Sequence, residues 1–292
     1  MELLISTIIS ALVMGGIYGG VGLGYSLIYK ASGSLNLSQG DFLTVGAFIG
    51  MTLTKYVGMN FFLALPLTMV CMFAVGVCVE RGVVNALLSR GAQSAYVILG
   101  TLAVSIVLQN GSMLIWGSQT QSAPPIFKDV LSVKVLGTAV PPEKLVALAV
   151  AVVCMLALHF FLKKSKFGTA MRAAALDARA AGAVGINVGV TKSVTWGISA
   201  AICGALGCVI GPALGLTTVL GSQIGTKAFA GAVVGGYGDM LGAVIGGLIF
   251  GVLEALVSLF ISSQYSMTIS FLALIIFMTI MPQGLMKAEI LE

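Results

Sequence analysis

The side chains that most often carry catalytic chemistry are scarce in this sequence. His159 is the single histidine among 292 residues, and no group of Cys, His, Asp or Glu has the spacing of metal ligands. His159 lies at the end of an apolar run, where an interfacial role is the simpler interpretation. The nearest approach to a phosphate-binding loop, 221–227 (GSQIGTK), is one residue too short between its glycines and has Thr before the Lys. The sequence therefore predicts no enzyme activity, no metal and no cofactor on this chain.

Three ionisable side chains lie in or beside apolar segments, where they are candidates for transport. Glu254 is the acid most deeply embedded in an apolar run, and a charge at membrane depth costs about 2.5–3.5 kcal/mol on insertion scales. A Glu at a polar helix interface is an equal alternative. Asp41 and Lys227 belong to two short apolar segments, as charged groups on broken helices of ion-coupled transporters do. A carboxylate in the first turn of a helix also stabilises that helix by roughly 0.5–2 kcal/mol, so helix capping is the competing explanation for Asp41.

The elements that must position these residues are membrane helices. Only 9% of the chain is charged and 58% is hydrophobic, whereas a soluble domain carries about 25% charged residues. Uncharged runs of the roughly 20 residues that cross a bilayer core recur along the whole sequence. The 38 glycines suit helices that pack closely in lipid, and the alternating pattern of an outer-membrane barrel is missing. The predicted fold class is an all-α polytopic membrane protein, with residues 1–292 in a single transmembrane domain.

Hydropathy predicts seven long spans and two short ones, which makes eight to nine membrane segments. The short segments, 42–54 and 225–237, have 13 residues each. As helices they would reach only about 20 Å, short of a bilayer core of roughly 30 Å. We interpret them as broken or re-entrant helices. The long spans are expected at 3–29, 61–79, 95–116, 145–162, 193–215, 240–262 and 266–283.

The regions around the two short segments resemble each other. Aligned without gaps at an offset of 185, residues 17–50 and 202–235 share 8 identities in 34 positions, five of them glycines. Chance in a Gly-rich chain is one explanation, and an internal duplication, common among transporters, is the other. If the short segments are crossings, five crossings separate the two repeat starts, and an odd number makes the repeats inverted. Repeat one is then about 1–162, followed by a loop at 163–192, and repeat two is about 193–283.

The loop 163–192 sets the predicted orientation. It carries six basic residues against one acid, and Lys and Arg favour the cytoplasmic side of a membrane. Counting crossings from this loop places the N-terminus outside and the C-terminal tail, with Lys287, in the cytoplasm. The longest external segment is then 117–144, which is either a simple connection or a docking surface for an external partner. The basic residues left outside are Lys55, Lys128, Lys134 and Lys144.

Within this loop, residues 168–185 (GTAMRAAALDARAAGAVG) are the most informative stretch. The stretch is rich in Ala, the best helix former, and has Gly at both ends. It is too polar to be a membrane span. A short basic helix at this place would either lie on anionic membrane lipid or insert into a groove on a soluble partner, with Arg172, Asp177 and Arg179 flanking a face of small residues.

Several segments, taken in order, resemble the LivH-type permeases of branched-chain amino acid ABC importers. Each segment is weak alone, but together they extend over almost the whole chain and are specific for that family. The segments are 24–29 (GYSLIY), 36–41 (NLSQGD), 108–110 (LQN), 163–173 (KKSKFGTAMRA) with 185–187 (GIN), 227–238 (KAFAGAVVGGYG) and 282–285 (PQGL).

The chain departs from the family pattern in two places. In the first loop, Ser38 and Gln39 stand where Ala and His are usual, and Asp41 stands where Glu is usual. In the tail, Met281 stands where Arg is usual. Because the first loop is a candidate for contact with the substrate, these departures leave the substrate open.

The resemblance implies a permease subunit of an ATP-binding cassette importer in a bacterial inner membrane. Such a subunit takes branched-chain or related hydrophobic amino acids from an external solute-binding protein and releases them in the cytoplasm. The implied partners are a second homologous permease subunit, two cytoplasmic ATPase subunits that bind the ATP, and membrane lipid, without nucleic acid. Two alternatives remain: a permease of the same class for urea or short amides, and a self-sufficient ion-coupled transporter.

Two groups of candidate residues follow. The resemblance implies that the loop 163–192 couples to an ATPase, through Gly168, Ala170, Arg172, Ala173, Asp177, Arg179, Gly182 and Gly185. We also expect the short segments after Gly40 and Gly225 to line the translocation path, whose candidate residues are Asn36, Gln39, Asp41, Thr44, Lys227 and Phe229.

Overall fold

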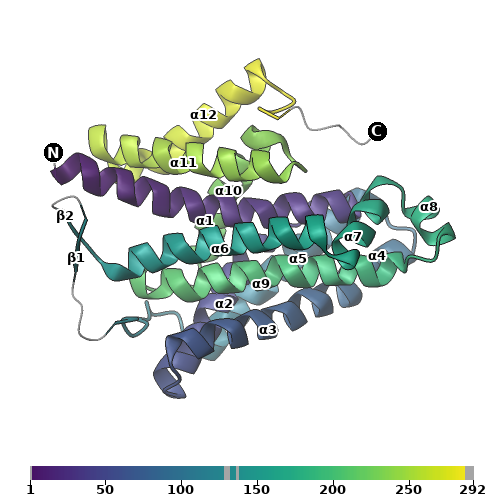
Figure 1. Ribbon diagram of the computed structural model, residues 1–292, viewed down its shortest axis with the longest axis horizontal. Coiled ribbons are helices and arrows are strands. Elements are labelled where there is room, and N and C mark those ends of the chain that lie inside the picture. Colours follow the sequence, from purple (N-terminus) through teal and green to yellow (C-terminus); the bar gives the residue numbers. More distant parts are fainter. Residues whose placement is uncertain (1, 128–131, 136–137, 287–292) are drawn as a thin grey trace.

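The apolar runs form a bundle of helices in the computed structural model, which describes residues 2–127, 132–135 and 138–286 (Figure 1). Within these residues, seven helices are long and apolar enough to cross a membrane, and they coincide with the seven long spans expected from hydropathy. The chain is therefore a polytopic α-helical membrane protein. Lys128 and Lys287, which the charge count uses, lie outside the described residues.

The helices occupy most of the chain. In the first half they are α1 (Glu2–Ser32), α2 (Gln39–Met51), α3 (Phe61–Val79), α4 (Asn85–Ser89), α5 (Ser94–Trp116) and α6 (Pro142–Lys164). In the second half they are α7 (Lys166–Leu176), α8 (Ala178–Ala183), α9 (Val188–Leu214), α10 (Leu220–Gly236), α11 (Met240–Phe260) and α12 (Ser266–Ile280). Turns of π-helix follow α2 at Thr52–Tyr56 and α3 at Glu80–Val84, and a 3₁₀ turn at Ser263–Tyr265 precedes α12.

Both short segments are helices, and both begin earlier than hydropathy predicts. α2 begins at Gln39 instead of residue 42, and the π-helical turn after it extends the helical stretch to Tyr56. α10 begins at Leu220 instead of residue 225. The first turns of both helices contain polar residues and glycines, which hydropathy assigns to loops. With its 17 residues, α10 is about 26 Å long, close to the thickness of a bilayer core.

The external segment 117–144 contains some β-structure. Strands β1 (Val133–Val135) and β2 (Thr138–Val140) form an antiparallel pair in which Val133 lies opposite Val140. Earlier in the segment, Gln121 and Leu216 exchange two backbone hydrogen bonds of 2.8 Å. This bridge joins the external segment to the residues that follow α9.

The helix α9 lies at the centre of the bundle. In its most apolar stretch 78% of the residues are buried, against 11% in α5 and in α12. Trp196 of α9 is the largest side chain that is fully buried. The exposed apolar side chains of α5 and α12 are suited to lipid or to another membrane subunit, because there is no water at this depth.

The contacts of α1 and α9 mirror each other. α1 packs against α10 and α11, whereas α9 packs against α2 and α3. At residue level, Gly22 of α1 approaches Ala228 of α10, and Gly207 of α9 approaches Leu43 of α2. The offset of 185 that aligns the two regions of sequence converts each of these contacts into the other.

Where α2 meets α10, the residues in contact are glycines, which have no side chains. A Cβ atom on Gly225 would lie 2.7 Å from the Cα of Gly40, closer than real side chains approach. The amide of Gly221 donates a hydrogen bond of 2.8 Å to the hydroxyl of Thr44. Glycine at this crossing therefore brings the N-terminal turns of the two helices side by side.

The crossing of α10 and α11 depends on glycines as well, and Gly246→Ala tests it. A Cβ atom on Gly246 would lie 2.8 Å from the amide nitrogen of Gly235 and would overlap the carbonyl oxygen of Gly231. Overpacking of this kind costs about 1–3 kcal/mol, so we expect Tm in detergent to fall by about 5 °C. The control is Gly111→Ala in α5, where nothing lies within 4 Å. Equal Tm values for the two variants would contradict the prediction.

Candidate functional site

The loop before α2 is fixed by a buried network of amide and hydroxyl groups. Asn36 Oδ1 accepts from the backbone amide of Ser38 at 3.0 Å, and Asn36 Nδ2 donates to Gln39 Oε1 at 3.0 Å. Gln39 Nε2 in turn donates to Ser199 Oγ of α9 at 2.7 Å. Asn36 and Gln39 are both buried. The structure therefore uses these two candidate path residues to anchor the start of α2 against α9.

Asp41 lies in the first turn of α2 and is 2% exposed. Its Oδ2 accepts a hydrogen bond from the hydroxyl of Ser105 on α5. Within the described part of the chain, Asp41 Oδ1 has no hydrogen-bond partner. The backbone amide of Ser38, the nearest group that a capping carboxylate would take, already donates to Asn36. Asp41 thus benefits from the helix dipole, but it makes no capping hydrogen bond.

A cavity of about 110 Å³ lies beside Asp41. Gly40 and Gly225, where α2 and α10 cross, line one part of it. The rings of Tyr25 and Phe229 form one wall, packed edge to face with centroids 5.4 Å apart. Besides the Tyr25 hydroxyl, the polar side chains that line it are Asp41, Ser105, Ser222 and Thr226. The structure therefore brings Asp41 and Phe229 of the candidate path together in one cavity.

Two other candidate path residues lie apart from this cavity lining. Thr44 is 1% exposed and accepts the hydrogen bond from Gly221, so its hydroxyl joins α2 to α10. Lys227 of α10 forms an ion pair with Glu254 of α11. The hydroxyl of Tyr18 on α1 donates to the second carboxylate oxygen of Glu254. Lys227 and Glu254 are 15% and 20% exposed, so both charges are largely enclosed by α1, α10 and α11.

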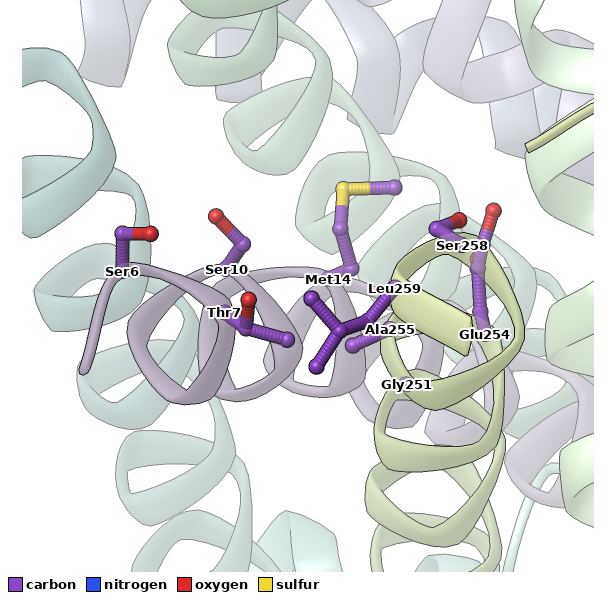
Figure 2. A pocket seen from close by; sticks show the side chains of 9 residues that line it. All are labelled: Ser6, Thr7, Ser10, Met14, Gly251, Glu254, Ala255, Ser258 and Leu259. Carbon is purple, nitrogen blue, oxygen red and sulfur yellow. The ribbon is translucent and has the colours of Figure 1, made fainter. Parts of the chain in front are cut away.

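A second cavity, of about 340 Å³, opens beside Glu254 between α1 and α11. Figure 2 shows Ser6, Thr7 and Ser10 along α1, with Glu254 and Ser258 on α11. Ser10 Oγ also accepts a hydrogen bond of 3.1 Å from Lys144 Nζ at the start of α6. The hydroxyl-rich lining places a polar cavity next to the ion pair.

The Ala-rich stretch 168–185 forms two helices instead of the single helix expected. Ser165 Oγ accepts from the amide of Gly168 at 2.8 Å, so α7 begins at Lys166, before Gly168. A Cβ atom on Gly168 would lie 2.6 Å from the Cα of Leu162, and the glycine is needed for the close turn from α6 to α7. Asp177 ends α7 and caps α8. The sequence analysis was wrong in placing a helix boundary at Gly168, because close packing requires that glycine.

The Asp177 cap is outside the membrane spans. Its Oδ1 accepts from the amides of Arg179 at 2.8 Å and Ala180 at 3.0 Å. These backbone hydrogen bonds, together with the nearby Arg179 charge, hold the pKa of Asp177 below its usual range. The carboxylate that breaks the stretch into two helices is therefore ionised at neutral pH.

The α7–α8 segment presents much of its surface to the outside of the bundle, at the end opposite the N-terminus (Figure 1). Two apolar side chains that were not predicted as site residues are also exposed on this segment: Leu176 at 78% and Val184 at 77%. The sequence did offer a signal for them, because they are large apolar residues in a stretch made mostly of alanine. Of the candidate coupling residues, Arg172, Asp177, Arg179, Gly182 and Gly185 are exposed, Ala170 and Ala173 are half-buried, and Gly168 is buried.

Comparison with known proteins identifies the family to which the chain belongs. The sequence profile of a family described as branched-chain amino acid transport system / permease component matches residues 7–278. The permease protein BraD of the high-affinity branched-chain amino acid transport system of Pseudomonas aeruginosa is 28% identical over 194 residues, 62% of each chain. The corresponding LivH protein of Salmonella typhimurium is 29% identical over 197 residues, 61% of each chain. The aligned part thus spans less than two thirds of the length of these relatives.

A solved structure shares the fold. PsaBC from Streptococcus pneumoniae in complex with Fab matches 97% of this chain and 93% of the other, with a TM-score of 0.52 and 15% sequence identity. At this identity the likeness concerns the arrangement of helices alone.

Proposed function

The chain belongs to the family of branched-chain amino acid transport permeases, and from this premise we propose that it is the membrane-spanning permease subunit of an ATP-binding cassette importer. It moves branched-chain or related hydrophobic amino acids from an external solute-binding protein into the cytoplasm. Its relatives are named as permease proteins, so the chain is a transport protein and not an enzyme.

The observation that carries this proposal is the α7–α8 segment. It is a pair of capped helices on which Arg172, Arg179 and Leu176 are exposed, as a docking element for a soluble partner requires. In our proposal the partners at this segment are two cytoplasmic ATPase subunits, which bind the ATP. Their closure on ATP pushes α7, and the tight contact of Gly168 with Leu162 passes the displacement to α6.

We propose the following orientation and internal symmetry. The basic loop 163–192 favours the cytoplasm, which places the C-terminus inside and the N-terminus outside a bacterial inner membrane. Figure 1 supports this arrangement, because the N-terminus lies at the end of the bundle opposite α7 and α8. The mirrored contacts of Gly22 with Ala228 and of Gly207 with Leu43 support an inverted repeat. With α2 and α10 counted as crossings, the chain crosses the membrane nine times.

In this proposal the translocation path runs along the exposed polar face of α10. Ser222 and Gln223 are exposed in the structure of the single chain, although they belong to a helix at membrane depth, where polar groups need partners. A second homologous permease subunit covers this face, and the path lies between the two subunits. The external binding protein delivers the solute at the end of the bundle that holds the N-terminus.

Purification from native cells, followed by transport measurements, tests the proposal. The tagged chain should bring with it two ATPases and a second permease, identified by mass spectrometry. Proteoliposomes made from this complex, with ATP and ATPase domains on one side and the binding protein on the other, should accumulate labelled leucine. A chain that is purified alone and transports leucine only along an ion gradient would contradict the proposal. Accumulation of urea in place of leucine would support the importer proposal but contradict the proposed substrate.

A further inference from the structure

The cavity beside Asp41 has the chemistry of an ammonium site. We propose that it binds the α-ammonium group of the transported solute and that Asp41 supplies the countercharge. This inference rests on the proposed function, because it concerns the substrate of the same path. It adds the group on the substrate that is recognised and the residues that recognise it.

The first argument is the charge of the cavity. Asp41 is the one carboxylic acid in its lining, and the described lining contains no Lys or Arg. The lysine that follows Thr226 in the sequence is occupied, because Lys227 is paired with Glu254. The cavity therefore has an uncompensated negative charge at membrane depth, and it favours a cation over an anion or an apolar group.

The second argument is the free oxygen. The Ser105 hydroxyl fixes the orientation of the Asp41 carboxylate through Oδ2, and Oδ1 is left buried without a hydrogen-bond partner in the described residues. Buried carboxylate oxygens are rarely left in this state, because losing water without gaining a donor is costly. Asp41 lines the cavity, and an N–H donor that enters it and turns the carboxylate toward itself would satisfy the oxygen.

The third argument is the number and type of acceptors. A primary ammonium group has three N–H donors. Asp41, Ser222 and Thr226 line the same cavity, and each side chain carries an oxygen that can accept. Thr226 donates its own hydrogen to the backbone oxygen of Ser222 at 2.6 Å, so its hydroxyl oxygen can accept. The cavity lining thus offers one oxygen acceptor for each of the three N–H donors.

The size and walls of the cavity agree with a small cationic head. A volume of about 110 Å³ holds roughly three or four waters at ~30 Å³ each, which suits an amino group and the carbons next to it. The Tyr25 and Phe229 rings also line the cavity, and aromatic rings are favourable neighbours for cations. The apolar side chain of the solute would then extend past the exposed rim at Ser222.

Asp41→Asn tests the site, because the change removes the charge and keeps the shape. In proteoliposomes that hold the whole importer, we expect leucine uptake to fall about tenfold or more, as for a lost charge-assisted hydrogen bond. The recovery of the assembled complex should be unchanged, and Asp41→Glu should restore part of the uptake. Thr226→Val, which removes one acceptor and no charge, should lower uptake by a smaller factor.

The matched control is Asp239→Asn. Asp239 also lies at the start of a helix, and its Oδ1 accepts from the amide of Gly242 at 2.6 Å. Asn caps helices as well as Asp does, so this variant should transport leucine like the wild type. If Asp41 were only a cap, Asp41→Asn would behave in the same way as the control.

Four outcomes would overturn the ammonium site. Leucine uptake at the wild-type rate in Asp41→Asn would contradict the ammonium site without contradicting the proposed permease function. Loss of the assembled complex together with uptake, in both Asp41→Asn and Asp41→Glu, would show a structural role. Leucine uptake that needs Na⁺ in the wild type, and no longer responds to Na⁺ in Asp41→Asn, would assign the oxygen to an ion. A wild-type importer that carries urea and no primary amine would overturn the substrate and the site together.

Discussion

Replacing Arg172 with Glu should abolish solute uptake by the assembled importer while the chain still folds in the membrane. Arg172 is exposed on α7 and lines a small hollow beside Lys30 of α1. A Glu at this position would face a lysine of the same chain, so reversal of the charge does not threaten the fold. It does reverse the charge offered to a docked ATPase. Losses of about 2–5 kcal/mol are usual for a docking charge of this kind, which is more than tenfold in affinity.

Uptake and recovery of the ATPases should both be measured for this variant, and membrane insertion should be checked by Tm in detergent. The matched control is Arg90→Glu, an equal reversal of charge in the exposed loop after α4. Normal uptake in Arg172→Glu would remove the coupling role of α7. Equal losses in both variants would point to a general effect of cytoplasmic charge.

Removing one partner of the Lys227–Glu254 pair should destabilise the chain strongly. Lys227→Met leaves the Glu254 carboxylate with the Tyr18 hydroxyl as its remaining described partner. Breaking an enclosed pair costs about 3–5 kcal/mol, and an unpaired charge at membrane depth costs a similar amount. We expect Tm to fall by about 10 °C or more.

The double variant Lys227→Met with Glu254→Leu distinguishes a broken pair from lost packing. Replacing both charges by apolar groups should return most of the stability, because no charge is then left enclosed. Lys55→Met is the control, since Lys55 is exposed and its ammonium lies 3.4 Å from the carbonyl of Ser122. An exposed contact of this type contributes little. A single variant as stable as this control would show that the pair does not matter for folding.

Much of the fold could be predicted from the sequence, because apolar content is a local property. The seven long spans follow from hydropathy alone, and the bounds of six agree with the helices to within about five residues, whereas the helical span that begins at Phe61 continues past residue 79 to Ser89. The starts of α2 and α10 were missed because their first turns are held by contacts between helices. Gly221, for example, is recognisable as helical only once its amide meets Thr44.

The candidate site was predictable in part. Asp41, Lys227 and Glu254 attract attention as charges in apolar surroundings, but their partners depend on which helices meet. Tyr18 is 236 residues away from Glu254, and Ser105 is 64 residues away from Asp41. No periodicity links positions so distant.

The sequence did indicate that one residue, Thr226, lies near Asp41. The offset of 185 that aligns the two short segments carries Asp41 onto Thr226. The structure places both residues at the same cavity. An internal alignment therefore indicates which residues meet where the two halves cross, even where the residue types differ.

The packing of α1 has a consequence for how the protein is made. α1 precedes the other described helices in the chain and is synthesised before them, yet its main neighbours are α9, α10 and α11. The hydroxyl of Tyr18 and the face of Gly15 that packs on Leu248 therefore lack their partners until the last third of the chain has been synthesised. Contacts between such distant segments form late and slowly. A nascent chain arrested after α6 would hold α1 against α6 but without α9, α10 and α11, and the period before α11 is inserted is when this protein most needs insertion factors and is most open to membrane proteases.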